Sequence, residues 1–149
     1  MTVDILLHIL FRFIHIGSVI LFIGGMAFAG FVFLPGIQGS VSALNAVTNI
    51  QRRFRGSLYT LIGLIFISGL YNYLTYAGPR HSSTYQIWFG IKFLLFLHVL
   101  SSAILWATTV AVDTAAITKS RKRLVSAAIS GFAIVLISAY LRSLSQRGL

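Results

Sequence analysis

The sequence predicts an all-α fold, a polytopic integral membrane four-helix bundle. Only 9% of its 149 residues are charged and 57% are hydrophobic, whereas soluble domains are about 25% charged. The mean hydropathy is +0.89. A spanning helix needs about 17–25 mostly apolar residues, and four stretches meet this length: about Ile5–Leu34, Ser57–Ala77, Gln86–Val112 and Leu124–Leu141. Because the connections are short, we expect residues 1–149 to form a single membrane domain.

The first span is predicted to be a retained helix, because the N-terminus lacks the positive region and cleavage site of a secretory signal. Over Phe13–Leu34 its only ionisable residue is His15. Gly25 and Ala29 have the small-xxx-small spacing that lets helix backbones approach in lipid. The pair Gly24–Gly25 leaves a mid-span gap that could admit a neighbouring helix or the flat face of a macrocycle.

The remaining spans share aromatic residues near one side of the membrane, which predict an interfacial belt: Tyr71, Tyr73, Tyr76, Tyr85, Trp88 and Tyr140. Over Phe93–Val112 the third span contains only His98 as an ionisable group. The fourth span is near the short limit, and its Ala127 and Gly131 repeat the small-residue spacing.

The distribution of cations predicts the orientation. The loops at Gly36–Arg55 and Asp113–Arg123 lie on one side of the membrane and carry Arg52, Arg53, Arg55, Lys119, Arg121, Lys122 and Arg123. Positive-inside counting places these loops in the cytoplasm and both termini outside, in a multi-pass protein of the cell (inner or plasma) membrane. The basic loops would attract anionic lipid headgroups. Because topology accounts for the net charge of +10, nucleic acid is not an expected partner.

Four basic groups lie in or at the edge of the apolar spans: Arg12, His15, Lys92 and His98. An ionisable side chain at this depth costs at least about 2.5–3.5 kcal/mol without a partner, so each marks a candidate site. The only carboxylates are Asp4 and Asp113, both at span edges. An anionic cofactor is therefore a natural partner for these groups.

Each basic group also has a purely structural interpretation. Arg12 and Lys92 can extend to the external interface. His15 can be neutral and hydrogen-bonded to a backbone carbonyl or a serine. His98 can pair with Ser101 or Ser102.

The first and third spans run in the same direction, so His15 and His98 could face each other in the external half of the bundle. If Arg12 and Lys92 lie at similar depth, the histidines differ in depth by about 4.5 Å at 1.5 Å per residue. Lys92 and His98 are about 120° apart around their helix. Only one of the two can point at the bundle axis, and the sequence leaves open which.

The side chains available as ligands favour haem over copper as the bound cofactor. Two histidines supply nitrogen ligands for a b-type haem iron or for copper, and Arg12 and Lys92 suit haem propionates. The chain has no cysteine, which excludes disulfides and thioether-attached haem. Cu(I) favours thiolate or thioether ligands, and Met26 is the only internal methionine.

Short motifs follow one another along three spans: Phe13-Ile-His15, Phe22-Ile-Gly24-Gly25, Leu34-Pro35, Arg52-Arg-Phe-Arg55, Ser68-Gly69-Leu70, Tyr85-x-x-x-x-Gly90-Ile-Lys92 and Phe93-Leu-Leu. In this order and spacing the chain resembles the copper-resistance D (CopD) superfamily of four-helix membrane proteins, which includes the HemJ-type protoporphyrinogen oxidases. The resemblance implies that His15 and Lys92 matter for haem binding and porphyrinogen oxidation, and the CopD branch implies copper uptake.

The sequence thus predicts a membrane redox protein that binds haem b. His15 is the first axial ligand and His98 the opposite one, so both are candidate metal ligands. Lys92 is an alternative ligand or a propionate partner, Arg12 helps to hold the propionates, and Gly24–Gly25 makes room for the ring. If the chain is an enzyme, His15 and Lys92 are its candidate catalytic residues and porphyrinogen or a quinone its partner.

Three alternatives remain open at this point. A CopD-like copper permease would hold or move copper without any porphyrin. A non-catalytic transmembrane subunit would work inside a larger electron-transfer complex or as a homo-oligomer. A membrane protein with purely structural histidines would bind no cofactor.

Overall fold

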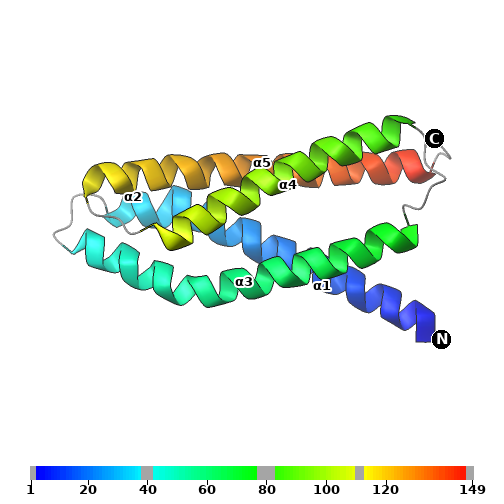
Figure 1. Ribbon diagram of the computed structural model, residues 1–149, viewed down its shortest axis with the longest axis horizontal. Helices are drawn as coiled ribbons and strands as arrows, with labels where there is room; N and C mark the ends of the chain where they lie inside the picture. Colours follow the sequence, from blue (N-terminus) through cyan, green and yellow to red (C-terminus); the bar gives the residue numbers. More distant parts are fainter. Residues whose placement is uncertain (1–2, 38–41, 77–82, 110–112, 147–149) are drawn as a thin grey trace.

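The computed structural model describes residues 3–37, 42–76, 83–109 and 113–146 as a bundle of four long helical segments (Figure 1). The first segment is continuous and consists of α1 (Val3–Phe28), a π-helical turn η1 (Ala29–Phe33) and α2 (Leu34–Ile37). The others are α3 (Ala43–Tyr76), α4 (Ser83–Thr108) and α5 (Thr114–Gln146). All four segments are long and apolar enough to cross a membrane. The predicted all-α, four-span fold class is confirmed.

The π turn has a cause in the sequence. Pro35 in α2 lacks a backbone N–H, and its ring collides with the carbonyl four residues earlier, which belongs to Phe31. A wider turn before the proline relieves this collision without ending the helix. The first segment therefore continues to Ile37.

Two helices are longer than predicted, because hydropathy detects only their apolar parts. α3 begins at Ala43 and α5 at Thr114, so most of the loops expected at 36–55 and 113–123 is helical. Arg, Lys and Gln are good helix formers, and no Gly or Pro stands between Ala43 and Arg55. Asp113 caps α5, since its Oδ1 accepts a 2.6 Å hydrogen bond from the Ala116 N–H. The predicted span ends Ala77 and Val112 lie outside the described residues.

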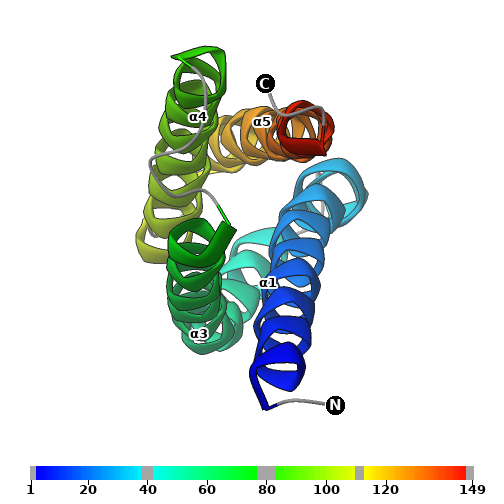
Figure 2. The same cartoon turned by 90° about the vertical axis from the view of Figure 1, so that its right-hand side faces the viewer.

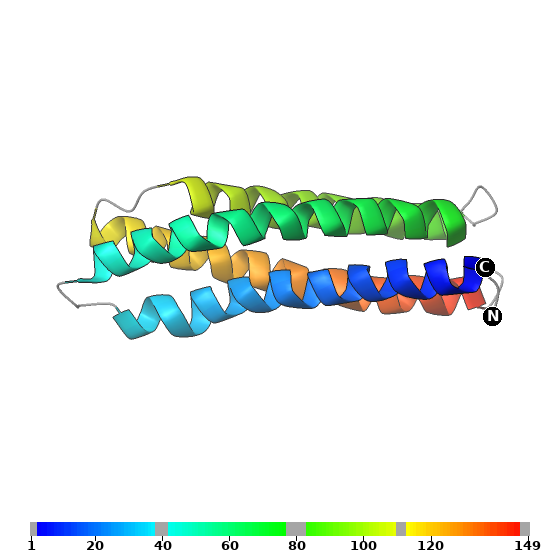
Figure 3. The same cartoon turned by 90° about the horizontal axis from the view of Figure 1, so that it is seen from below.

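The helices form a ring in the order α1, α3, α4, α5, and α5 packs back on α1 (Figure 2). α1 and α4 are diagonally opposite. Figure 3 shows that α1 begins and α5 ends at the same end of the bundle. We call this the terminal end, and we call the opposite end, where α2 stops and α3 starts, the basic end.

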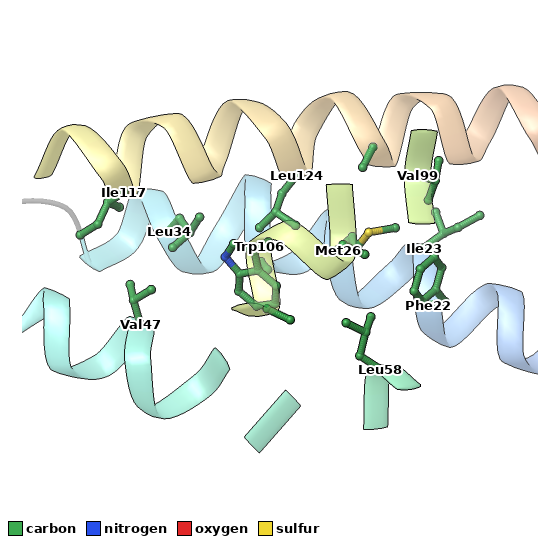
Figure 4. Close-up of a cluster of buried hydrophobic side chains, with 14 of the residues drawn as sticks. Phe22, Ile23, Met26, Leu34, Val47, Leu58, Val99, Trp106, Ile117 and Leu124 are labelled. Atoms are coloured by element: carbon green, nitrogen blue, oxygen red, sulfur yellow. The ribbon is translucent and has the colours of Figure 1, made fainter. Parts of the chain in front are cut away.

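The buried core occupies the half of the bundle toward the basic end. Its largest fully buried side chains include Phe22, Met26, Leu34, Leu58 and Trp106 (Figure 4). Toward the terminal end the packing is looser. Among the described residues, none is buried in α1 before Ser18, in α3 after Ser68 or in α4 before Val99. Of the described helices, only α5 has buried side chains there, Leu141 and Leu144. The bundle thus has a dry half and a more open half.

Candidate functional site

Lys92 faces the interior of the bundle, and His98 does not. Val99 and Trp106 follow Lys92 at seven-residue steps on α4, and each is 1% exposed. Residues at this spacing share a helix face, so Lys92 points along the buried face. His98 is exposed, and its Nε2 lies 3.2 Å from Ser126 Oγ on α5. The structure therefore decides the choice between the two that the sequence leaves open.

His15 faces the interior from α1, on the face that also carries the buried Phe22 and Ala29. Its Nδ1 lies 3.0 Å from Ser68 Oγ on α3. Next to Ser68 a glycine, Gly69, makes room for the ring, because a Cβ there would lie 3.1 Å from His15 Cε1. The imidazole consequently lies directly against the α3 backbone, at the boundary between the dry and open halves.

The Ser68 hydroxyl can form two hydrogen bonds at once, one to the Leu64 carbonyl of its own helix and one with His15 Nδ1. When its single hydrogen goes to Leu64, Ser68 Oγ accepts from Nδ1–H of His15. In that tautomer the lone pair lies on Nε2. Metal-ligating histidines have this arrangement, in which one nitrogen donates to a fixed acceptor and the other binds the metal.

Lys92 and His15 both face the interior of the bundle, from α4 and α1. Its side chain is half-buried, and no described residue forms a hydrogen bond or ion pair with it. The two carboxylates of the chain lie elsewhere, with Asp4 in the first turn of α1 and Asp113 at the start of α5. Within the described part of the bundle, the Lys92 cation is not neutralised by the protein.

Asn72 adds a second polar group without a partner. It lies one turn beyond Ser68 on the same face of α3, toward the terminal end. Its Oδ1 is buried and accepts no hydrogen bond from any residue that the structure describes, which leaves a desolvated acceptor at a cost of about 1–3 kcal/mol. We call His15, Ser68, Asn72 and Lys92 together the polar layer. It draws on α1, α3 and α4 and combines a ligand nitrogen, a cation and an amide.

Arg12 and the glycine pair lie outside this layer. Arg12 is exposed on α1, as expected for a side chain that extends to the interface. Gly24 is also exposed, and a Cβ there would meet nothing within 4 Å. A Cβ at Gly25 would lie 3.3 Å from the Phe54 ring. The gap at Gly25 thus admits a side chain of the neighbouring helix α3.

The aromatic residues predicted as a belt form contacts between helices. Three ring pairs join neighbouring helices near the terminal end, with centroid distances of 4.1 Å for Phe11–Tyr71, 4.5 Å for Tyr73–Phe89 and 5.3 Å for Trp88–Tyr140. Tyr85 is half-buried on α4. The Tyr76 side chain lies outside the described residues. These pairs hold the open half of the bundle together where the core does not reach.

Sequence reasoning did not single out Ser68 or Asn72 as site residues. Asn72 carried a usable signal, since an amide within an apolar span is itself an intramembrane polar group. Ser68 carried none, because serine is tolerated in membrane helices through bonds to its own backbone.

The fold and hydropathy define the chain as a four-span integral membrane protein. Comparisons with protein-family models, with curated proteins and with solved structures found no match. The resemblance to the CopD superfamily therefore remains a resemblance of motifs. Among the described residues no three His, Cys, Asp or Glu side chains gather as metal ligands.

Proposed function

We propose that the protein is a membrane redox protein that binds haem b in the polar layer, with His15 Nε2 as an axial ligand. The contact of His15 with Ser68 carries this proposal. When Nδ1 donates to Ser68 Oγ, 3.0 Å away, Nε2 keeps the lone pair that a haem iron needs. Haem, when bound, supplies one-electron iron chemistry, and the protein supplies ligation, orientation and charge.

Lys92 and Asn72 fit the polar periphery of the same cofactor. Haem propionates are carboxylates, and Lys92 is a cation that the described residues leave unneutralised. The Asn72 amide lies at the same level and can donate through its nitrogen. Lys92 can alternatively coordinate through a neutral amine, and His98 would have to change its contact with Ser126 to reach the iron.

Two observations favour haem over copper transport. Haem needs only one or two ligands from the protein, whereas the described residues do not gather three copper ligands. The dry half closes the bundle axis below the layer, with Phe22 and Trp106 at 2% and 1% exposure. A permease would need a path through this region.

We further propose the orientation that the cations predict, with both termini outside and the basic end in the cytoplasm. The polar layer then lies in the external half of the membrane. Electron exchange with a quinone and oxidation of a porphyrinogen both suit this location, and a subunit of a larger electron-transfer complex would use the same ligands.

The test is the absorption spectrum of the detergent-purified protein, oxidised and then reduced with dithionite. We expect a Soret band that sharpens on reduction, with resolved α and β bands. His15→Ala should abolish haem retention. His98→Ala is the matched control. If this variant retains haem, the opposite ligand is Lys92 or a group from outside the protein. If it loses haem, His98 is the opposite ligand. Normal haem content in the His15→Ala, His98→Ala double variant would disprove the ligand assignment, and a featureless wild-type spectrum after expression with ample haem would disprove the function.

A further inference from the structure

The face of α1 that packs on α5 loses its cover toward the terminal end. Ile23 is 8% exposed, and its side chain reaches within 2.9 Å of where a Gly131 Cβ would lie on α5. Ile16 and Ile9 follow at seven-residue steps on the same helix face, yet they are 50% and 56% exposed. Helix α5 therefore covers this face at Ile23 and no longer covers it two turns further on.

The other three interfaces stay closed at this level. α1 is tied to α3 by the His8–Tyr71 hydrogen bond of 3.0 Å and by the Phe11–Tyr71 stack. Ring pairs join α3 to α4 and α4 to α5. Figures 1 and 2 show α1 diverging from α5 toward the N-terminus.

The separation lies at the depth of the polar layer. α1 and α5 are antiparallel, so the contact of Ile23 with Gly131 places Ile16 opposite Ser138. His15 is the neighbour of Ile16 in the chain. Ser138 is half-buried and its hydroxyl donates to Ile134 of its own helix, 2.7 Å away. It therefore makes no bond that would close the two helices together.

We infer that the polar layer opens sideways into the bilayer between α1 and α5, and that haem b enters from the lipid through this opening. The inference rests on the proposed function. Exposed isoleucines flank the opening, so it suits an apolar ring and not a hydrated ion. At this depth the layer holds His15, which contacts Ser68 on α3, and the half-buried Lys92 of α4, and these groups complement the iron and the carboxylates of an amphiphilic porphyrin.

The test uses Ser138→Trp, which places a bulky ring in the opening, and Leu136→Trp as the matched control. Leu136 is 72% exposed on the same helix, so a Trp there faces lipid without approaching the opening. Both variants are reconstituted in vesicles with brominated acyl chains, and the added tryptophan fluorescence is compared with the wild type. In a second measurement, apoprotein vesicles are mixed with haem-loaded vesicles, and the Soret band is followed in time.

We expect bromine to quench both added tryptophans, and Ser138→Trp to load haem on the order of tenfold more slowly, because an indole fills a space of side-chain width. Its final haem content should equal that of Leu136→Trp.

An unquenched Trp at position 138 would show that the opening is covered, whether or not haem binds. Quenching with an unchanged loading rate would overturn the lateral route while His15 ligation stands. A lower final haem content at an unchanged rate would mean that the Trp disturbs the site, and it would overturn the route equally. A wild type that takes up no haem would refute haem as the occupant and, with it, the proposed function.

Discussion

At the scale of single residues, the polar layer lowers the stability of the apoprotein. Lys92 is a cation within an apolar span, and Asn72 Oδ1 is a buried acceptor without a donor. Neither is offset by a described neighbour. An intramembrane cation without a partner marks a candidate binding site. The Asn72 amide can offer N–H donors to a carboxylate ligand, which would leave Oδ1 without a donor. His15 differs from them, because Ser68 already satisfies one of its nitrogens.

Replacing Ser68 by Ala should weaken haem binding by about 10–100-fold, the usual effect of losing the outer partner of a ligating histidine. The His15 ring would lose the hydroxyl partner of its Nδ1. Titration of the apoprotein with haem, followed at the Soret band, measures this change. Thr60→Ala on the same helix is the control, because the Thr60 hydroxyl is exposed and donates to the Gly56 carbonyl of its own helix. Equal affinities in the two variants would contradict the role of Ser68.

Replacing Lys92 by Met should stabilise the apoprotein while it weakens haem binding. The variant removes an unneutralised charge, which is worth up to about 3 kcal/mol in a bilayer, and it also removes the partner of a propionate. Unfolding of the apoprotein in detergent by SDS, followed by circular dichroism, tests the first effect. Arg12→Met should change apoprotein stability by less than about 0.5 kcal/mol, because Arg12 is exposed. Destabilisation by Lys92→Met would show that the lysine has a structural partner.

The sequence could identify His15 and Lys92 but could not orient Lys92 against His98. α4 is apolar on all sides, so no polar face shows which side meets lipid. That choice depends on the neighbouring helices, which bury Val99 and Trp106 and leave His98 exposed. The Ser68 contact was equally inaccessible, because it joins residues 53 positions apart.

At the scale of helices, single glycines decide where two segments approach. Gly25 accepts the Phe54 ring, and Gly131 accepts Ile23. The sequence predicted close packing at both positions from their spacing, and the contacts confirm it. The register of the partner helices could not be read from the spacing, because small residues recur throughout apolar helices.

Gly25→Leu should destabilise the bundle by about 1–3 kcal/mol, since the new side chain would overlap the Phe54 ring. Gly24→Leu should have little effect, because a Cβ there would meet nothing within 4 Å. Thermal unfolding of the two variants in the same detergent compares these neighbours directly. If Gly24→Leu instead impaired haem binding at normal stability, the predicted role of Gly24 in holding the ring would be supported.

The end of α4 depends on two side chains of α3. Gln51 is 3% exposed, and its Nε2 donates to the carbonyls of Trp106 and Thr109 at 2.7 and 3.2 Å. Arg55 donates to the Ala107 carbonyl at 2.9 Å. These bonds satisfy carbonyls that the helix end leaves free. They explain why helix α3 has to extend so far beyond the predicted span.

Gln51→Leu should loosen the last turn of α4 and cost about 1–3 kcal/mol, because buried carbonyls would lose their donor. Amide hydrogen exchange over residues 103–109 should quicken, while exchange in the first turns of α4 stays unchanged. Arg52→Gln is the control, since Arg52 is exposed and donates to Asn49 of its own helix. Unchanged exchange in the Gln51 variant would mean that α4 ends independently of α3.

At the scale of the whole molecule, the bundle is divided into a dry half at the basic end and a polar, more open half at the terminal end. The sequence predicted the number of spans and the side on which the cations gather. It did not predict the division, because every span is apolar throughout. The division arises from helix crossing, which brings α1 and α5 together at Ile23 and Gly131 and apart beyond them.

The orientation can be tested with single cysteines, because the chain has none of its own. Thr114→Cys lies at the basic end and Ser83→Cys at the terminal end, and both positions are exposed. In intact cells, a membrane-impermeant maleimide should label Ser83→Cys and leave Thr114→Cys unlabelled until the membrane is permeabilised. The reverse pattern would place the polar layer in the cytoplasmic half.

The closed core at the basic end has an electrical consequence. Phe22, Met26 and Trp106 fill the bundle axis below the polar layer and are at most 2% exposed, so we expect no water-filled path through this part of the bundle. Planar bilayers containing the protein should therefore show no conductance above that of the lipid. An electron or proton that moves between the polar layer and the terminal end crosses only part of the membrane, and therefore only part of the membrane potential. The membrane potential can bias such chemistry, but the protein cannot discharge it.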